Sequence, residues 1–355
     1  MFKSKETLWM VVVGTIIGII AAVLVVLGNP ANMGFCIACF IRDMAGAFGL
    51  HRAGAVQYAR PEIIGLILGS FLIAFGTKEF KARGGSAPIT RFVLGFFVMI
   101  GALMFLGCPF RMILRIAGGD LNAIVGLVGF AVGIGVGVYF LNRGFTLKRS
   151  VVLRASDGVI LPVAALITLF VLLFVPSLLL FTEAGAGPGA MYAPLWISLI
   201  AGALVGIMAQ RTRFCMVGGI RDFILFREWK LLLGFLAVIV SAGIVNVIAG
   251  NFTLGFAGQP IAHTDGLWNF LGMLTVGFGS TLLGGCPLRQ LILSGEGNSD
   301  SVVTVLGLFA GAAFAHNFGL ASSGKGPTSA GMIAVVLGIV IMLLIAFFNS
   351  KESTN

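Results

Sequence analysis

The sequence predicts an all-α polytopic membrane protein. Of its 355 residues, 58% are hydrophobic and only 10% are charged, and the mean hydropathy is +1.07. A soluble domain averages roughly 25% charged residues, so the composition excludes a soluble enzyme, a nucleic-acid-binding domain and a disordered protein. The 51 glycines are about twice the usual share, and small residues let helices approach closely in lipid.

Ten apolar segments are long enough to be membrane spans, since about 20 apolar residues cross a bilayer. The first follows Lys3 and Lys5 and is longer than the core of a signal peptide, which has about 7–15 residues. We therefore expect it to stay uncleaved. The expected spans are 8–28, 61–77, 91–107, 121–141, 158–181, 193–210, 231–250, 267–285, 301–321 and 330–348.

The basic residues predict the orientation. With the N-terminus in the cytoplasm, 17 of the 23 lysines and arginines lie in cytoplasmic segments and 6 in outer ones. Cytoplasmic loops carry the excess of Lys and Arg in membrane proteins. Both termini are therefore predicted to be cytoplasmic, and the net charge of +10 needs no nucleic acid to explain it.

Two motifs occur twice along the chain. The segment FCIACFIRD at 35–43 returns as FCMVGGIRD at 214–222, an offset of 179, and GCPFR at 107–111 returns as GCPLR at 285–289, an offset of 178. Nearly equal offsets indicate a duplication. The extra span 158–181 turns the second copy over, and inverted repeats are typical of secondary transporters. We expect a first repeat at 1–145, a connecting span at 146–185, an inverted second repeat at 186–325 and a last span at 326–355.

The motif segments are too short and polar for ordinary spans. Phe35–Leu50 and Cys108–Ala117 carry Arg between apolar residues and are bounded by glycines. They predict four re-entrant half-helices, or else the broken ends of spans 91–117 and 267–294. Such irregular backbone is allowed only where it lines a cavity or is buried in protein.

Four of the five cysteines stand at the starts of these segments, and two of them precede a proline. Pro favours the first position of a helix, which places Cys108 and Cys286 at N-caps, where the helix end attracts anions. Arg111 and Arg289 follow one turn later on the same face. One buried cysteine is usually a packing residue, but four at repeat-related positions favour a substrate pathway, with no metal or cofactor. The pathway residues are Cys36, Cys108, Cys215 and Cys286.

Other residues support this pathway or offer a different chemistry. Cys36 and Cys39 form a CxxC pair that suits a redox reaction, although Gly218 stands at the position equivalent to Cys39. Intramembrane charges usually pair, so Arg42 with Asp43, and Arg221 with Asp222, predict structural ion pairs.

Three further features favour structural roles. His316 and Asn317 fall within a span, where hydrogen-bonded structure is favoured over a proton relay. The glycines at 129, 133 and 137 predict a helix-packing seam. The sequence GLASSGK at 319–325 mimics a phosphate-binding loop, but it follows a membrane helix instead of a strand.

The paired motifs resemble those of the YeeE/YedE (sulphur transport) family over nearly the whole chain, and the opening GNPANMGFCIACFIRD is closest to the selenium-associated YedE branch. The resemblance implies a bacterial inner-membrane importer, not an enzyme, for thiosulfate or a related sulphur or selenium anion. It also implies that Cys36, Cys108 and Cys286, with Cys215 as the fourth, pass the substrate inward by successive weak contacts. A TusA-like cytoplasmic sulphur carrier is a common companion in this family.

One departure leaves the substrate open, and two other functions compete. This chain fills all four cysteine positions and adds Cys39, so a selenium oxyanion or a selenosulphur compound stays possible beside thiosulfate. The first competing function is a membrane thiol–disulfide oxidoreductase that uses Cys36 and Cys39. The second is a receptor for a sulphur carrier, which would tolerate loss of Cys108 but not of cytoplasmic arginines.

Overall fold

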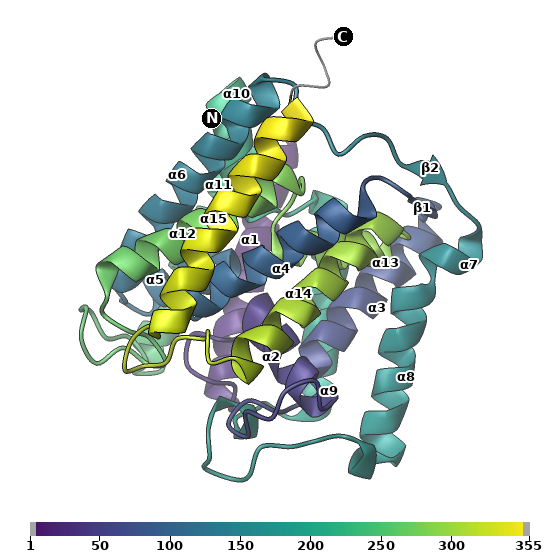
Figure 1. Cartoon of the computed structure of the whole chain (residues 1–355). Coiled ribbons are helices and arrows are strands. Elements are labelled where there is room, and N and C mark those ends of the chain that lie inside the picture. Colours follow the sequence, from purple (N-terminus) through teal and green to yellow (C-terminus); the bar gives the residue numbers. More distant parts are fainter. Residues whose placement is uncertain (1–4, 351–355) are drawn as a thin grey trace.

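A computed structural model describes residues 5–350, which form a tightly packed bundle of helices (Figure 1). One short antiparallel pair joins β1 (Arg83–Gly84) to β2 (Val151–Val152). The helices are α1 Lys5–Val26, α2 Ile37–Ala47, α3 Pro61–Gly76, α4 Pro88–Phe105, α5 Pro109–Ala117, α6 Asn122–Asn142, α7 Ala155–Gly158, α8 Ile160–Phe174, α9 Leu195–Thr212, α10 Met216–Phe226, α11 Lys230–Ile248, α12 Gly266–Leu282, α13 Pro287–Gly295, α14 Ser299–Asn317 and α15 Ser329–Ser350, with short 3₁₀ turns at Pro176–Leu178 and Pro188–Ala190.

All ten predicted spans are helical, which confirms the all-α membrane fold. Eight helical stretches within residues 5–350 are long and apolar enough to cross a membrane, and α3 and α8 are shorter apolar helices. The α8 helix ends at Phe174, earlier than the predicted 158–181, because Pro176 disfavours helical backbone in the residue before it. In Figure 1, α1 begins and α15 ends near the same end of the molecule.

Two spans are broken near their middle. The α4 helix ends at Leu106, which has left-handed backbone, and α5 begins directly after Cys108. Lys81 beside α4 bonds to the end of α13 at Glu296, whereas the end of α5 at Gly119 bonds to the loop after α11. The α4–α5 and α12–α13 pairs each form one apolar stretch, Pro88–Ala117 and Gly266–Gly295, that is interrupted by a turn, which favours broken spans over separate half-helices.

The α2 helix is instead re-entrant. The loop 27–36 turns back along α1, so closely that a Cβ on Gly34 would lie 2.0 Å from the Ala21 carbonyl oxygen. Because the loop turns back, Cys36 lies beside α1 and not beyond its end. The α2 helix then runs back toward the side of the bundle on which α1 ends. Its counterpart α10 follows α9 after only the three residues 213–215.

The helices pack in matched pairs. The α1 helix packs on α11 and α9 packs on α3, while α4 packs on α14 and α12 on α6. If α1–α6 correspond to α9–α14 in order, each of these pairs has its counterpart in the other half, and α4 meets α12 between them. This pairing agrees with the predicted duplication; the inversion of the second copy stays a prediction.

Glycines make these pairings close. Along α6, a Cβ on Gly129 or Gly133 would lie 2.2 Å from a carbonyl oxygen of α12, and one on Gly137 would lie 2.5 Å from Thr281. Such distances leave no room for a methyl group. The three glycines therefore form the predicted seam, with α12 as its partner.

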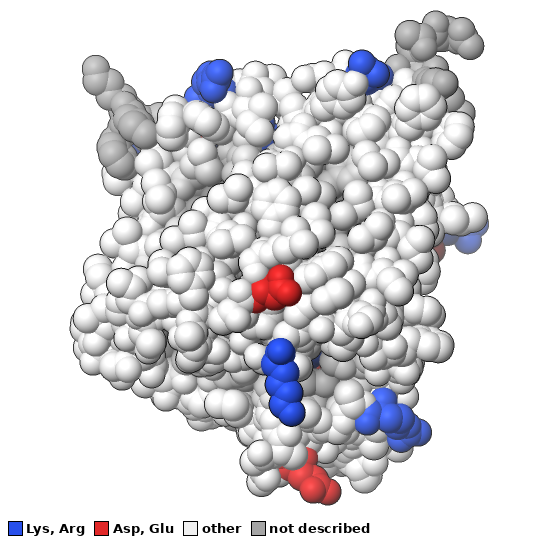
Figure 2. Space-filling model, turned by 60° about the vertical axis from the view of Figure 1, so that its left-hand side comes forward, with Lys and Arg blue, Asp and Glu red and all other residues white. Residues whose placement is uncertain are grey.

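Few charges interrupt the surface. Figure 2 shows a face that is mostly free of Lys, Arg, Asp and Glu, with the charged side chains few and widely separated. Large apolar side chains such as Leu72, Ile167 and Ile248 are exposed on the helices instead. Because lipid tails are as apolar as these side chains, such a surface suits a multi-pass membrane protein.

We expect Gly133→Ala to destabilise the protein by about 1–3 kcal/mol, because the added methyl group would overpack the seam. Gly135→Ala lies on the same helix with nothing within 4 Å of the added carbon. It should leave stability unchanged or raise it slightly. Thermal unfolding of both detergent-purified variants beside the wild type checks this, and equal midpoints would contradict the seam.

Candidate functional site

Each of the four repeated cysteines caps the N-terminus of a short helix. Cys36 and Cys215 precede α2 and α10, and their sulphurs accept hydrogen bonds from the backbone N–H groups of Cys39 at 3.3 Å and Gly218 at 3.4 Å. Cys108 and Cys286 precede Pro109 and Pro287 at the starts of α5 and α13. The predicted N-caps are therefore confirmed, and four positive helix ends carry thiols.

The thiols lie in two pairs, one from each half of the chain. The sulphurs of Cys215 and Cys286 are 3.9 Å apart. Cys36 and Cys108 lie close enough to influence each other electrostatically, while the Cys39 thiol donates to the Leu106 carbonyl over 3.9 Å. All five thiols are free and buried.

A row of phenylalanine rings connects the two pairs. Phe35, directly before Cys36, meets Phe110 with ring centroids 6.4 Å apart, and Phe110 meets Phe214, directly before Cys215, at 6.5 Å. All three rings are almost fully buried. The space between the thiol pairs is therefore filled by apolar side chains in this conformation.

A cavity of about 300 Å³ reaches one thiol pair, and we call it the basic cavity. Four cations and two acids line it together with Cys215, and a second hollow of about 290 Å³ shares its Arg213 and Arg289. The start of α1 lies close by, because Glu6 bonds to Lys230 over 2.5 Å. The ionisable lining residues are Arg213, Cys215, Arg221, Asp222, Glu228, Lys230 and Arg289.

A larger cavity of about 530 Å³ lies at the opposite end of the bundle, and we call it the His316 cavity. Arg42, Leu106, Ile261, His316 and Ser322 are among its lining residues, and no carboxylate lines it. Thiols do not line it either, since Cys36, Cys39 and Cys108 are at most 1% exposed.

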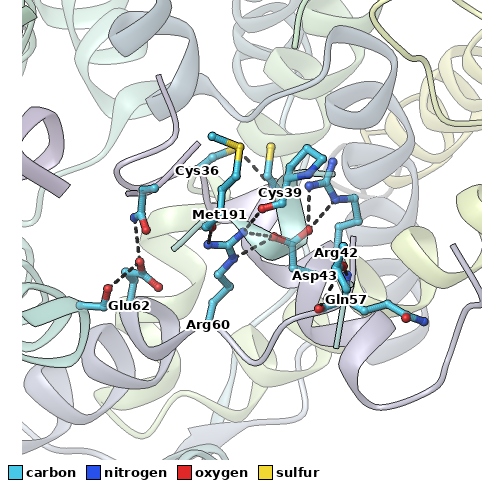
Figure 3. Close-up of polar contacts among 12 residues, drawn as sticks. Cys36, Cys39, Arg42, Asp43, Gln57, Arg60, Glu62 and Met191 are labelled. Carbon is cyan, nitrogen blue, oxygen red and sulfur yellow. Dashed lines mark hydrogen bonds and ion pairs between the residues drawn. The ribbon is translucent and has the colours of Figure 1, made fainter. Parts of the chain in front are cut away.

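Arg42 and Asp43 form the predicted ion pair and belong to a larger network. Both Nε and Nη2 of Arg42 donate to one oxygen of Asp43, at 2.9 and 2.7 Å. Arg60 donates to the other oxygen at 2.8 Å and also to the carbonyls of Pro188 and Met191. Figure 3 shows Asp43 between the two guanidinium groups. This buried network ties α2 to α3 and to the chain before α9.

The equivalent pair in the second half is more open. Arg221 donates to Asp222 over 2.8 Å, but these side chains are 28% and 20% exposed and line the basic cavity. No third arginine joins them among residues 5–350. This predicted ion pair is also confirmed, and it is more exposed to solvent than the Arg42–Asp43 pair.

Arg111 binds backbone carbonyls, whereas Arg289 forms a side-chain ion pair and lines the basic cavity with Cys215. Arg111 donates to the carbonyls of Leu106, Pro260 and Ile261, while Arg289 donates to Glu296 over 2.9 Å. The break in α4 leaves carbonyls without helical partners, and a guanidinium has enough donors for several of them. Among residues 5–350, the buried Nε of Arg111 has no partner.

Sequence reasoning missed several polar residues at the site. Arg115 pairs with Asp120 over 2.6 Å and donates to the Phe105 carbonyl at the break. His51 is buried, forms a hydrogen bond with the Arg42 carbonyl at 3.0 Å and lies against the His316 ring, with ring centroids 4.7 Å apart. Burial lowers the pKa of His51, so it is neutral at pH 7. Asp43 could be predicted from the FCxxCxxRD motif. Its partner Arg60 lies outside that motif, and no local sequence pattern identifies it.

No group of three or more His, Cys, Asp or Glu side chains within residues 5–350 is arranged to hold a metal ion. The polar groups that converge here are helix ends, thiols and guanidinium groups. These are donors to an anion. The arrangement can therefore bind a small anion.

Comparison with known proteins agrees with this chemistry. Residues 211–350, which contain the second copy of both motifs, match the family described as "Sulphur transport". The chain therefore resembles this sulphur-transport family within that segment. It is 32% identical over 111 residues to the thiosulfate transporter TsuA of Escherichia coli (strain K12). That alignment spans 30% of this chain and 30% of the relative.

We expect Asp43→Asn to destabilise the protein by about 3–5 kcal/mol, because two buried guanidinium groups would lose their carboxylate. Asp222→Asn is the matched control in the other half. Its pair is partly exposed, so its loss should cost less than about 1 kcal/mol. Thermal unfolding of both variants in detergent checks this. Similar losses of stability would show that burial does not make the Asp43 network more stabilising than the Asp222 pair.

We expect Cys215 to be the one repeated cysteine that a charged maleimide reaches quickly, because it lines the basic cavity and is 6% exposed. Labelling of vesicles from each side, followed by mass spectrometry of the cysteine peptides, checks this. Cys215→Ser should remove the fast phase and Cys39→Ser should keep it. Fast labelling of Cys108 from the same side would contradict the separation of the two thiol pairs.

Proposed function

We propose that this protein carries a small sulphur- or selenium-containing anion across a membrane, along a central path that passes both thiol pairs. The observation that carries this proposal is the set of four thiols at four helix N-termini in the middle of the bundle. The match of residues 211–350 to a sulphur-transport family supports it.

The chemistry of these caps suits a soft anion. A helix N-terminus offers free N–H groups and partial positive charge, which would favour sulphate or phosphate as much as thiosulfate. Thiols add polarisable sulphur, which a terminal sulphur or selenium atom can contact closely. Each contact is weak, and a carrier path needs sites that bind the substrate yet release it. The unpartnered Nε of Arg111 adds one buried cationic donor near Cys36.

The direction follows from the distribution of charge. Cytoplasmic segments carry the excess of basic residues, and the basic cavity gathers four of them. We therefore assign the basic cavity to the cytoplasmic side and the His316 cavity to the outer side of a bacterial inner membrane, with both termini cytoplasmic. An anion would be drawn inward by the more positive end.

The proposed architecture is two inverted repeats, at 1–145 and 186–325, joined by the span at 146–185 and followed by the span at 326–355. The matched helix pairs and the two matched thiol pairs support this division. Inversion would bring the two sets of caps toward the membrane centre from opposite sides.

The substrate is proposed at the level of its class. The similarity to a protein named as a thiosulfate transporter supports thiosulfate. The fifth cysteine, Cys39, is buried with the outer pair and gives a reason to test a selenium species as well. We further propose that a TusA-like carrier receives the sulphur at the basic cavity, whose exposed arginines and lysine would suit an acidic partner surface.

We expect cells that lack their own routes to take up labelled thiosulfate or selenite when they express this protein. Cys108→Ser and Cys286→Ser should each reduce uptake at least tenfold, because each removes one thiol pair. Cys39→Ser should keep most of the uptake, since Gly218 holds its place in the second half. Membrane insertion of each variant is measured alongside.

The same experiment separates the competing functions. An oxidoreductase that uses Cys36 and Cys39 would show no uptake of either label and would lose its redox activity in Cys39→Ser. A receptor for a sulphur carrier would show no uptake, would tolerate Cys108→Ser and would lose carrier binding in Arg213→Ala. Either result would replace transport as the function.

A further inference from the structure

Leu106 has a backbone conformation that is unusual for leucine. Its φ of 62° and ψ of 40° are left-handed, a region that Gly occupies freely and that crowds the Cβ of other residues. The offset of 178 that relates Cys108 to Cys286 relates Leu106 to Gly284, whose φ is +79°. Both broken spans therefore use the same left-handed turn two residues before the cysteine, but only one of them carries a side chain there.

The two residues line different cavities. Leu106 lines the His316 cavity, is 4% exposed, and its carbonyl accepts from Cys39 and Arg111. Gly284 lines the basic cavity, and nothing lies within 4 Å of the position that its Cβ would take. A leucine side chain thus stands at the first break, and open space takes its place at the second.

The exposure of the thiols follows this difference. Cys215 lines the basic cavity, whereas neither Cys36 nor Cys39 has any exposed surface. The basic cavity is therefore open to one thiol of its pair, that of Cys215. Leu106 lines the His316 cavity, and its carbonyl accepts a hydrogen bond from the Cys39 thiol.

The His316 cavity has the chemistry to hold an anion. Arg42 lines it, no carboxylate does, and Ser322 adds a hydroxyl group. The Nε2 atom of His316 is buried and has no hydrogen-bond partner among residues 5–350. Buried polar atoms normally have a hydrogen-bond partner, so this nitrogen is expected to bind a ligand or a water molecule. When Nε2 carries the proton, the ring can donate a hydrogen bond to an anion.

We propose that the His316 cavity is a separate receiving site for a small divalent anion, bound by Arg42 and His316, and that the Leu106 side chain divides this site from the outer thiols. This inference rests on the proposed transport function and adds a binding step before the first cysteine. In this proposal, the Leu106 side chain closes the route from the His316 cavity to the outer thiols. Gly284, which has no side chain, leaves the route from the basic cavity to Cys215 open.

Leu106→Gly tests the barrier without threatening the fold, because glycine relieves the left-handed backbone. Vesicles of both orientations are treated with a membrane-impermeant charged maleimide, and the cysteine peptides are quantified. From the side opposite to the one that labels Cys215, Leu106→Gly should raise labelling of Cys36 or Cys39 at least tenfold over the wild type. Unchanged labelling would overturn the barrier.

Gly284→Leu is the matched control at the second break. It should slow the labelling of Cys215 at least tenfold and leave the outer thiols as slow as in the wild type. If Gly284→Leu leaves Cys215 equally fast, the side chain at this turn does not control access. Labelling does not depend on transport. It therefore tests the barrier at Leu106 independently of the uptake experiment, which tests the proposed function.

His316→Asn tests the receiving site. Its amide replaces the ring beside Arg42, and we expect the thiosulfate concentration for half-maximal uptake to rise about tenfold while the maximal rate changes little. Labelling of Leu106→Gly should be the same with and without His316→Asn. An unchanged half-saturating concentration would overturn the receiving site, and complete absence of uptake by the wild type would overturn the proposed function instead.

Discussion

A helix that breaks inside a membrane must find partners for the backbone groups that the break sets free, and the rest of this site depends on that constraint. Water is absent there, and each unsatisfied group is costly. The thiols of Cys36 and Cys215 accept from N–H groups at two new helix starts. Arg111 and Arg115 donate to the carbonyls of Leu106 and Phe105 that the end of α4 leaves open. The same side chains that stabilise the breaks thus bring thiols and guanidinium groups into the core.

The two halves use different side chains to bind the carbonyls at their breaks. As a result, the thiols of one half are more accessible than those of the other. The α4 break uses two buried arginines, and the charge of Arg115 in turn requires Asp120 nearby. At the α12 break, Gln290 donates to the carbonyls of Leu283 and Gly285. A neutral amide needs no counter-ion, so fewer groups close around the second break. Arg289 instead pairs with Glu296, and both line the second hollow beside the basic cavity.

Much of the fold and the chemical core of the site could be predicted from the sequence, because both depend on local patterns. Apolar runs located the spans, and the Cys-Pro motifs located helix starts. The partners of Asp43 could not be predicted in the same way: Arg60 is 17 residues away and is brought close only by the return of α2. Likewise, the basic cavity draws residues from α9 to α13, so no single segment reveals it.

The row of phenylalanines sets a condition on any carrier mechanism. Phe35 and Phe214 directly precede the cysteines of the two thiol pairs, so their rings lie beside the turns that hold the thiols. An anion has no polar partner among buried rings and cannot rest there. In the proposed pathway the two thiol pairs therefore act in turn. Transfer between them requires Phe110 to leave its place between the other two rings, with its α5 helix still anchored by Arg115 at the break.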